Sequence, residues 1–182
     1  ISEQSFTTHP YKHPTIGSMA DLEAAAIDDV RDFYRSYYVP SNATVVLVGD
    51  FDWNEALALV GVYMGRVPAA TRPVPRDIPK EPPQRAERRV TLEEDWPLPV
   101  VVVVHHITYD GDPDSYPLHI ASKILSDGQS SRIYRKLVYE KQVALAAFGE
   151  GNIIEDPNLF FAVAIVNPGH TPEEAEKALI EE

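Results

Sequence analysis

Cysteine is absent from this sequence, which excludes disulfide bonds and thiol chemistry and leaves the redox compartment open. Positive charge is scarce, since 16 Lys and Arg stand against 28 Asp and Glu and give a net charge of −12. Phosphate-rich partners require clustered Lys and Arg, so we expect neither nucleic acid nor an anionic membrane as the main partner. No apolar run approaches the roughly 18 residues of a membrane-spanning helix, so no membrane span is expected.

An initiating methionine and a signal peptide are missing as well. The chain starts at Ile1 and stops at Glu182, inside what reads as a helix, so we expect a segment of a longer protein. The composition is that of an ordinary globular chain, with 44% hydrophobic and 24% charged residues. A length of 182 residues can bury a core in one domain or in two small ones.

Prolines gather in one stretch of the chain. Residues 66–84 hold six of them, at positions 68, 73, 75, 79, 82 and 83. Such a stretch can neither continue a helix nor join a central strand, and it behaves as an extended, semi-rigid spacer. We therefore expect a first part over residues 1–66, a linker over 67–84 and a second part over 85–182.

The part before the linker carries three helix signals and one strand signal. The helix signals are side chains suited to cap a first turn and apolar residues at helical spacing. The strand signal is a continuous apolar run. In order, we expect a helix opened by a capping box of Ser18 and Asp21, a helix from Ile27 to Pro40, a buried strand over Ala43–Phe51 and a helix over 53–63 capped by Asp52.

The part after the linker is richer in strand signals. Five successive valines, Val100–Val104, predict a central strand buried on both faces. The other expected elements are an exposed strand over Arg88–Glu94, a helix over Asp114–Ser126, a hairpin of residues 143–154 and 159–166 around 155–158, and a last helix with Thr171 as cap and Pro172 at its first position. Together the elements predict an α+β fold, a two-layer α/β sandwich with a mainly antiparallel sheet.

The stretch from Asp127 to Ala146 combines a helix stop, a helix start and a strand. Gly128 ends one helix, and Ser130 or Ser131 caps the next. The N–H groups at that helix start could hold an anion, but a serine cap is the commoner use of the pattern. No general base neighbours these serines in sequence, so a serine nucleophile is not expected. The helix is predicted to group Ile133, Tyr134, Leu137 and Val138 on its apolar face, with Arg132 mostly elsewhere, before a strand that follows Lys141.

The histidines do not suggest a metal site. His9 and His13 are four residues apart and would share a face of a helix, but Pro10 and Pro14 disfavour a helix here. Residues 1–17 are therefore expected to form an extended surface loop. His105 and His106 follow the valine run, and adjacent strand residues point to opposite faces. They are therefore expected to pack or hydrogen-bond rather than to chelate one ion. The six histidines are His9, His13, His105, His106, His119 and His170.

Three blocks of residues, taken in order, carry a family resemblance. They are His9-Pro10-Tyr11 through Gly17; Phe33-Tyr34, Tyr37-Tyr38, Pro40, Asn42 and Val46–Asp52; and Leu125–Tyr134, with Gly128, Ser130, Ser131, Arg132 and Tyr134, followed by Leu137 and Glu140–Ala144. The sequence resembles the pitrilysin/insulinase family of zinc metallopeptidases, most closely the bacterial members similar to mitochondrial processing peptidase. The resemblance implies that residues 1–66 close one α/β repeat and residues 85–182 open the next, in the region known as the inactive domain.

The resemblance also implies where the metal chemistry lies. In the family, zinc is held by the two His of a His-x-x-Glu-His motif and by a Glu further downstream. None of the six histidines begins that motif here, and in the family the motif lies upstream of the His-Pro-Tyr block. We therefore expect no catalytic residue and no metal ligand in this chain, zinc in the parent protein, and no hydrolysis by the chain alone.

A substrate-contacting pair of the family is replaced. Many members carry an Arg and a Tyr at the positions matched here by Val138 and Leu145. Neither of these side chains can donate a hydrogen bond to a carbonyl oxygen. In two-chain members one subunit holds zinc and the other holds the pair, so by resemblance this chain is similar to the zinc-bearing subunit.

Three functions stay open on the sequence. The first is a non-catalytic segment of a zinc metalloendopeptidase that helps form the peptide-binding chamber. The second is a structural or assembly subunit of the same fold, and the third is an unrelated α/β binding module. Expected partners are a peptide substrate, a zinc-bearing domain or subunit, and further copies of this chain. Bacterial relatives are often exported, which favours a periplasmic or exported location over the cytoplasm and leaves the compartment and the substrate open.

Overall fold

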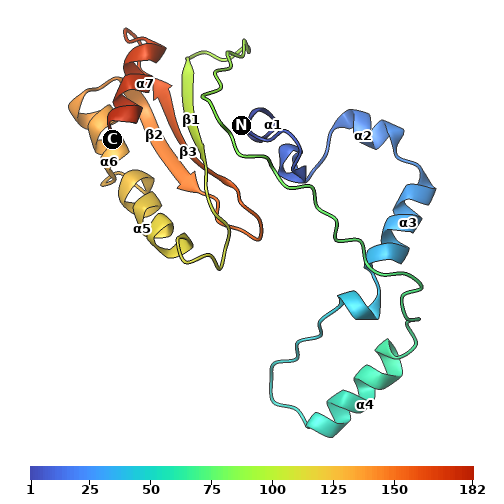
Figure 1. Ribbon diagram of the computed structural model, residues 1–182. Helices are drawn as coiled ribbons and strands as arrows, with labels where there is room; N and C mark the ends of the chain where they lie inside the picture. Colours follow the sequence, from blue (N-terminus) through green and yellow to red (C-terminus); the bar gives the residue numbers. More distant parts are fainter. The chain divides into compact units, whose positions relative to one another are not determined.

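The computed structural model describes residues 1–182 and divides them into two compact units. One unit consists of residues 1–12 together with 81–182, and the other of residues 13–80 (Figure 1). Residues 1–12 therefore pack with the far end of the sequence. The expected division into 1–66, 67–84 and 85–182 concerns the repeats of the family and stays a prediction.

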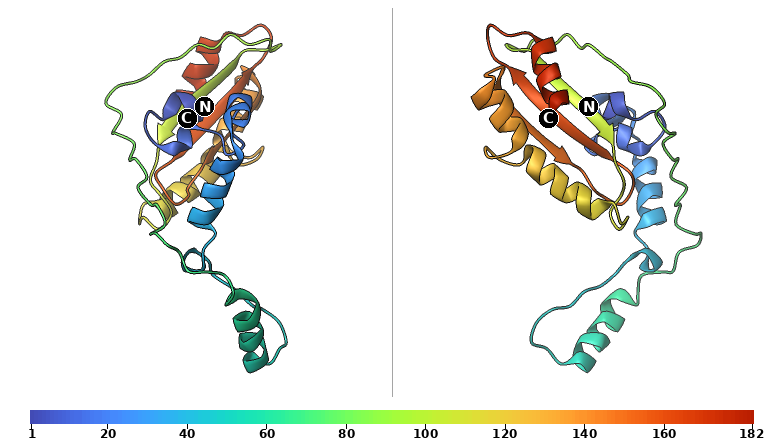
Figure 2. Two further views of the ribbon diagram at one scale, coloured as in Figure 1. Left: turned by 90° about the vertical axis from the view of Figure 1, so that its right-hand side faces the viewer. Right: turned by 60° about the vertical axis from the view of Figure 1, so that its left-hand side comes forward.

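A three-stranded antiparallel sheet is the centre of the first unit. Its strands are β1 (Val100–His106), β2 (Ala144–Gly151) and β3 (Leu159–Val166), in the order β1-β3-β2 (Figure 2). Val163 of β3 pairs with Val102 on one side and with Phe148 on the other. The hairpin expected from the two apolar runs around residues 155–158 is thus confirmed, since β2 and β3 pair directly.

Helical segments cover one face of this sheet. Their buried side chains, among them Ile133, Leu137 and Leu179, contact the small sheet residues Ala147 and Ala164. The covering segments are α5 (Ser115–Ser126), α6 (Arg132–Tyr134), the π-helical turn η3 (Arg135–Glu140) and α7 (Pro172–Glu181). The expected α+β fold, a two-layer sandwich with a mainly antiparallel sheet, is confirmed. None of the helices is long and apolar enough to cross a membrane.

Strand β1 differs from the expectation for its five valines. It lies at an edge of the sheet and not at its centre, which β3 occupies. Val101 and Val103 pack toward the helices, whereas Val100 and Val102 are 44% and 39% exposed. The prediction of a strand buried on both faces is wrong in this structure because the helices cover only one face of the sheet.

Residues 1–12 are also more structured than the expected extended loop. They contain the short helix α1 (Ser2–Ser5) and the 3-10 turn η1 (Pro10–Lys12). Phe6 is only 1% exposed, and its ring contacts the ring of His106 edge-on at a centroid distance of 5.3 Å. The loop prediction failed because proline breaks long helices but permits short turns, and because an aromatic side chain anchors the segment.

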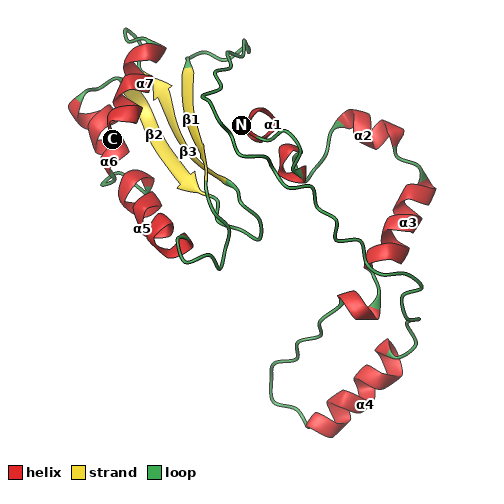
Figure 3. Cartoon of the chain, viewed as in Figure 1, coloured by secondary structure: helices red, strands yellow, loops and turns green.

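The unit of residues 13–80 consists of helices joined by irregular segments. Figure 3 shows no strand around α2, α3 and α4. The helices are α2 (Met19–Ala24), α3 (Ile27–Tyr37) and α4 (Trp53–Met64), with the 3-10 turn η2 (Pro40–Asn42). The expected caps are present. The Ser18 hydroxyl accepts from the Asp21 N–H at 3.1 Å, and Asp52 accepts from the Glu55 N–H at 2.9 Å.

Two expected strands do not form. Residues 43–51 contain no strand and are exposed, with Val46 and Val48 at 75% and 92%. Residues 88–94 are irregular as well. A strand requires hydrogen bonds to a neighbouring strand, and no other segment of residues 13–80 is a strand that could supply them. For residues 43–51 the apolar composition was identified correctly, but residues 13–80 contain no neighbouring strand.

At Gly149, helix α5 and strand β3 both approach strand β2 closely. A Cβ at this position would lie 2.4 Å from the backbone oxygen of Phe161 and 3.1 Å from the Cβ of Ser126. Gly151 is a matched control, because its added Cβ would meet Ser122 Oγ at an acceptable 3.4 Å.

We predict that Gly149→Ala lowers the free energy of unfolding by about 2–3 kcal/mol, since the backbone of β3 has to move. Gly151→Ala should cost less than about 1 kcal/mol, because its neighbours need to shift only slightly. Urea unfolding followed by circular dichroism measures both values. Equal losses in the two variants would show that the close approach at Gly149 is not what limits side-chain size there.

Candidate functional site

The motif stretch begins with the helix stop and cap expected from sequence. Gly128 has a φ of 75°, a conformation that favours glycine, and follows the end of α5. The Ser131 hydroxyl accepts from the Tyr134 N–H at 3.4 Å and is buried. Of the two candidate serines, Ser131 is therefore the cap, and its oxygen serves the helix start. Ser130 is exposed.

The helix that follows is not uniform. From Arg135 to Glu140 the backbone is π-helical, and the Lys141 N–H donates to the Lys136 oxygen at 2.9 Å. Gln142 then adopts a φ of 54°, a left-handed conformation that costs a residue with a Cβ. The side chain of Asn167 holds this turn by donating to the Gln142 oxygen at 2.9 Å. Sequence reasoning expected an ordinary helix and missed Gln142.

The two positions of the replaced substrate-contacting pair lie on either side of this turn. Val138, on η3, is partly buried and packs against the core, whereas Leu145, on β2, is 50% exposed. Their correspondence to the Arg and Tyr of the family stays a prediction. Arg132 and Tyr134 have local partners, since Arg132 pairs with Glu182 at 3.0 Å and Tyr134 contacts the ring of Tyr139.

His9 belongs to a buried aromatic cluster and not to a surface loop. It is 5% exposed, and its Nδ1 accepts from the Tyr11 N–H at 3.1 Å. Its Nε2 is buried and lies 3.6 Å from Asp156 Oδ2, beyond hydrogen-bond distance. The Asp156 N–H donates to the Tyr11 hydroxyl at 3.3 Å. The His-Pro-Tyr block therefore anchors the N-terminal segment on the loop between β2 and β3.

A carboxylate that sequence reasoning did not single out holds the same segment. Glu81 accepts from the N–H groups of Thr7, Thr8 and His9 at 2.8, 2.9 and 3.0 Å, and from the Thr7 hydroxyl at 2.6 Å. Desolvation opposes ionisation, but these hydrogen bonds together outweigh it and lower the pKa of Glu81 to about 2. Glu81 is therefore ionised at neutral pH. One glutamate in a proline-rich stretch gives no local signal of this role.

The residues of this chain do not fit a zinc site. No three His, Cys, Asp or Glu side chains lie together as possible ligands of one ion. The Nδ1 of His9 accepts from the Tyr11 N–H, and the Nδ1 of His170, just before α7, lies 2.9 Å from Glu174 Oε2. His105 and His106 are neighbours on β1, whose adjacent side chains point to opposite faces.

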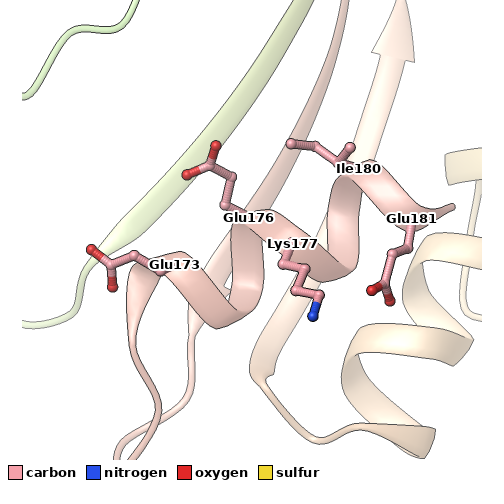
Figure 4. Close-up of a pocket in the computed structure, with 5 residues that line it drawn as sticks. All are labelled: Glu173, Glu176, Lys177, Ile180 and Glu181. Carbon is pink, nitrogen blue, oxygen red and sulfur yellow. The ribbon is translucent and has the colours of Figure 1, made fainter.

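A surface pocket on α7 is lined mainly by charged side chains, of which Glu176 and Glu181 are each paired with a cation (Figure 4). Its lining residues are Glu173, Glu176, Lys177, Ile180 and Glu181. Glu176 accepts from both terminal nitrogens of Arg89, at 2.6 and 2.7 Å, and this pairing lowers its pKa. Lys141 likewise lowers the pKa of Glu181. Ionised, paired carboxylates are poor general acids, so Glu176 and Glu181 are not suited to that role.

Comparison with known proteins identifies the family of the chain. The sequence model of the Peptidase M16 inactive domain matches residues 25–182. Since that match covers most of the chain, the chain belongs to this family. The expected relationship to the pitrilysin/insulinase metallopeptidases, and to their inactive domain, is confirmed.

The similar proteins are more than twice as long as the region of them that this chain matches. "Zinc protease PqqE" of Helicobacter pylori is 27% identical over 178 residues, which are 97% of this chain and 40% of that protein. The crystal structure of a protease from Helicobacter pylori has a TM-score of 0.88 at 27% identity and covers 99% of this chain and 44% of that chain. A Peptidase M16 inactive domain from Pseudomonas fluorescens, at 16% identity and a TM-score of 0.77, shares the fold. The chain thus spans less than half the length of these relatives.

The positive φ of Gln142 generates a stability prediction. Gln142→Gly should raise the free energy of unfolding by about 1 kcal/mol, because glycine adopts the left-handed conformation without the steric cost of a Cβ. Gln142→Ala is the matched control, and it should give no gain because it keeps the Cβ. Chemical denaturation measures both variants, and a loss of stability in the glycine variant would contradict the strain argument.

Proposed function

We propose that this chain is a non-catalytic segment of a zinc-dependent endopeptidase, and that it helps to form the chamber that holds a peptide substrate. The zinc motif would lie upstream of Ile1 in the same protein. One observation carries the proposal: the chain belongs to the inactive-domain family and matches 40% of the length of a zinc protease over nearly its own full length.

The open backbone of residues 43–51 supports a role as part of a larger assembly. Four consecutive apolar side chains there, Val45 to Val48, are all at least 47% exposed. An unpaired apolar extended segment tends to add to the edge of another sheet. We infer that the remainder of the parent protein supplies that sheet, so that residues 13–80 complete a domain begun elsewhere.

The charge of the chain suits a particular class of peptide. A net charge of −12 attracts basic peptides to this chain over a long range. Salt screens the attraction beyond about 8 Å at physiological ionic strength. Peptide and the zinc-bearing domain or subunit are therefore the proposed partners. A periplasmic or exported location is proposed by analogy with bacterial members of the family.

Metal content tests the proposal on the full-length parent protein. We predict one zinc ion per full-length chain, bound upstream of Ile1, and none bound by the 182-residue chain after dialysis. Substituting a histidine of the upstream motif should remove the zinc, whereas His9→Ala, the matched control within this chain, should leave it. Inductively coupled plasma mass spectrometry gives the stoichiometry. A full-length protein without zinc and without the motif would instead be a structural or assembly subunit of the same fold.

The exposed apolar segment also predicts self-association of the 182-residue chain. Light scattering should show a mass that rises with concentration, because Val46 and Val48 offer an uncovered strand. Val46→Lys with Val48→Lys should reduce the effect, since charge on an edge opposes pairing. Val90→Lys, at another exposed valine outside this segment, is the control and should not. A clean monomer at high concentration would rule out self-association.

A further inference from the structure

Both ends of the 13–80 unit pass through the same small group of hydrogen bonds. The chain enters this unit after Lys12 and leaves it after Lys80. Just before the entry lie Thr7, Thr8 and His9, and just after the exit lies Glu81. The Glu81 carboxylate joins the two sides, since its Oε1 accepts from the Thr7 N–H and its Oε2 from the N–H groups of Thr8 and His9.

We propose that Glu81 and residues Thr7–His9 form a closed neck within the sheet unit, which holds together the two places where the chain leaves that unit for residues 13–80 and returns from them. Without it the two crossings would be independent tethers. Successive backbone N–H groups that converge on one anion are a strong arrangement, because each hydrogen bond is charge-assisted. This inference concerns the attachment alone and does not depend on zinc chemistry or on the proposed chamber.

A second set of contacts fixes the neck to the sheet unit. Phe6 packs on the ring of His106 at the end of β1, and the backbone oxygen of Ser5 lies 3.2 Å from His106 Nε2. On the other side of the neck, Tyr11 receives the N–H of Asp156 from the β2–β3 loop. The neck is therefore anchored to the sheet unit by residues that lie both before and after Thr7–His9 in sequence.

The neck changes the role of the proline-rich stretch. Residues 66–84 are expected from sequence to act as one continuous spacer, but Glu81 lies inside that stretch and is fixed. Pro68, Pro73, Pro75 and Pro79 lie before the fixed point, and Pro82 and Pro83 lie after it. Glu81 therefore divides the stretch into a part that belongs to the 13–80 unit, where Arg76 donates to Asn42, and a part that belongs to the sheet unit.

Glu81→Gln tests the neck in the 182-residue chain. The glutamine side chain lacks the negative charge and has one acceptor oxygen in place of two. Hydrogen exchange of the backbone N–H groups of Thr7, Thr8 and His9 should therefore rise at least about tenfold. Glu87→Gln is the matched control, because Glu87 lies in the same segment and accepts hydrogen bonds only from Arg89. Exchange of the β3 amides should not change in either variant.

Spin labels report directly on the closure, and the absence of native cysteine allows them to be placed freely. With labels at Lys12→Cys and Pro82→Cys, the distance distribution should be narrow in the parent chain and in Glu87→Gln, and broad in Glu81→Gln. A narrow distribution in Glu81→Gln would overturn the proposal, as would a broad one in the parent chain. Faster exchange in β3 as well would also overturn it, because Glu81 would then support the whole sheet unit and not a local neck.

Discussion

Close packing of helices on a surface of small residues is the constraint on which the sheet unit depends. Ala144, Ala147, Ala162 and Ala164 form the floor beneath α6, η3 and α7, and Gly149 of β2 leaves room for the backbone of β3 and for α5. Larger side chains would push the helices away and expose Leu137, which is fully buried. The position of the motif stretch follows from this floor, because its helix sits directly on it.

The elements that were predicted correctly from sequence are those specified by adjacent residues. The boundaries of β3, the caps at Ser18, Asp52 and Thr171, and the stop at Gly128 all follow from local patterns. The environment of an apolar run, in contrast, does not follow from the local sequence pattern. Val100–Val104 reads as a central strand but lies at an edge, and Ala43–Phe51 reads as a buried strand but has no neighbour. Composition indicates that a segment is apolar enough to be buried, but whether it is buried depends on which strands or helices lie next to it in the fold.

The candidate site shows the same limit more strongly. The serine cap was readable because acceptor and donor lie three residues apart. The anchoring of His9 and Tyr11 on Asp156, and of residues 7–9 on Glu81, joins positions separated by 72 to 147 residues, which no local pattern encodes. The missing zinc motif was readable, because a motif is local. The strained turn at Gln142 was hidden, because a glutamine in a left-handed conformation leaves no mark in the sequence.

The anchoring of the N-terminal segment has a consequence for synthesis on the ribosome. Phe6 and His9 leave the exit tunnel long before their receptors, because His106 and Asp156 are translated about 100 and about 147 residues later. Until then Phe6, His9 and Tyr11 have only one another as ring partners. Residues 1–12 are thus translated well before the residues of the sheet unit that complete their contacts.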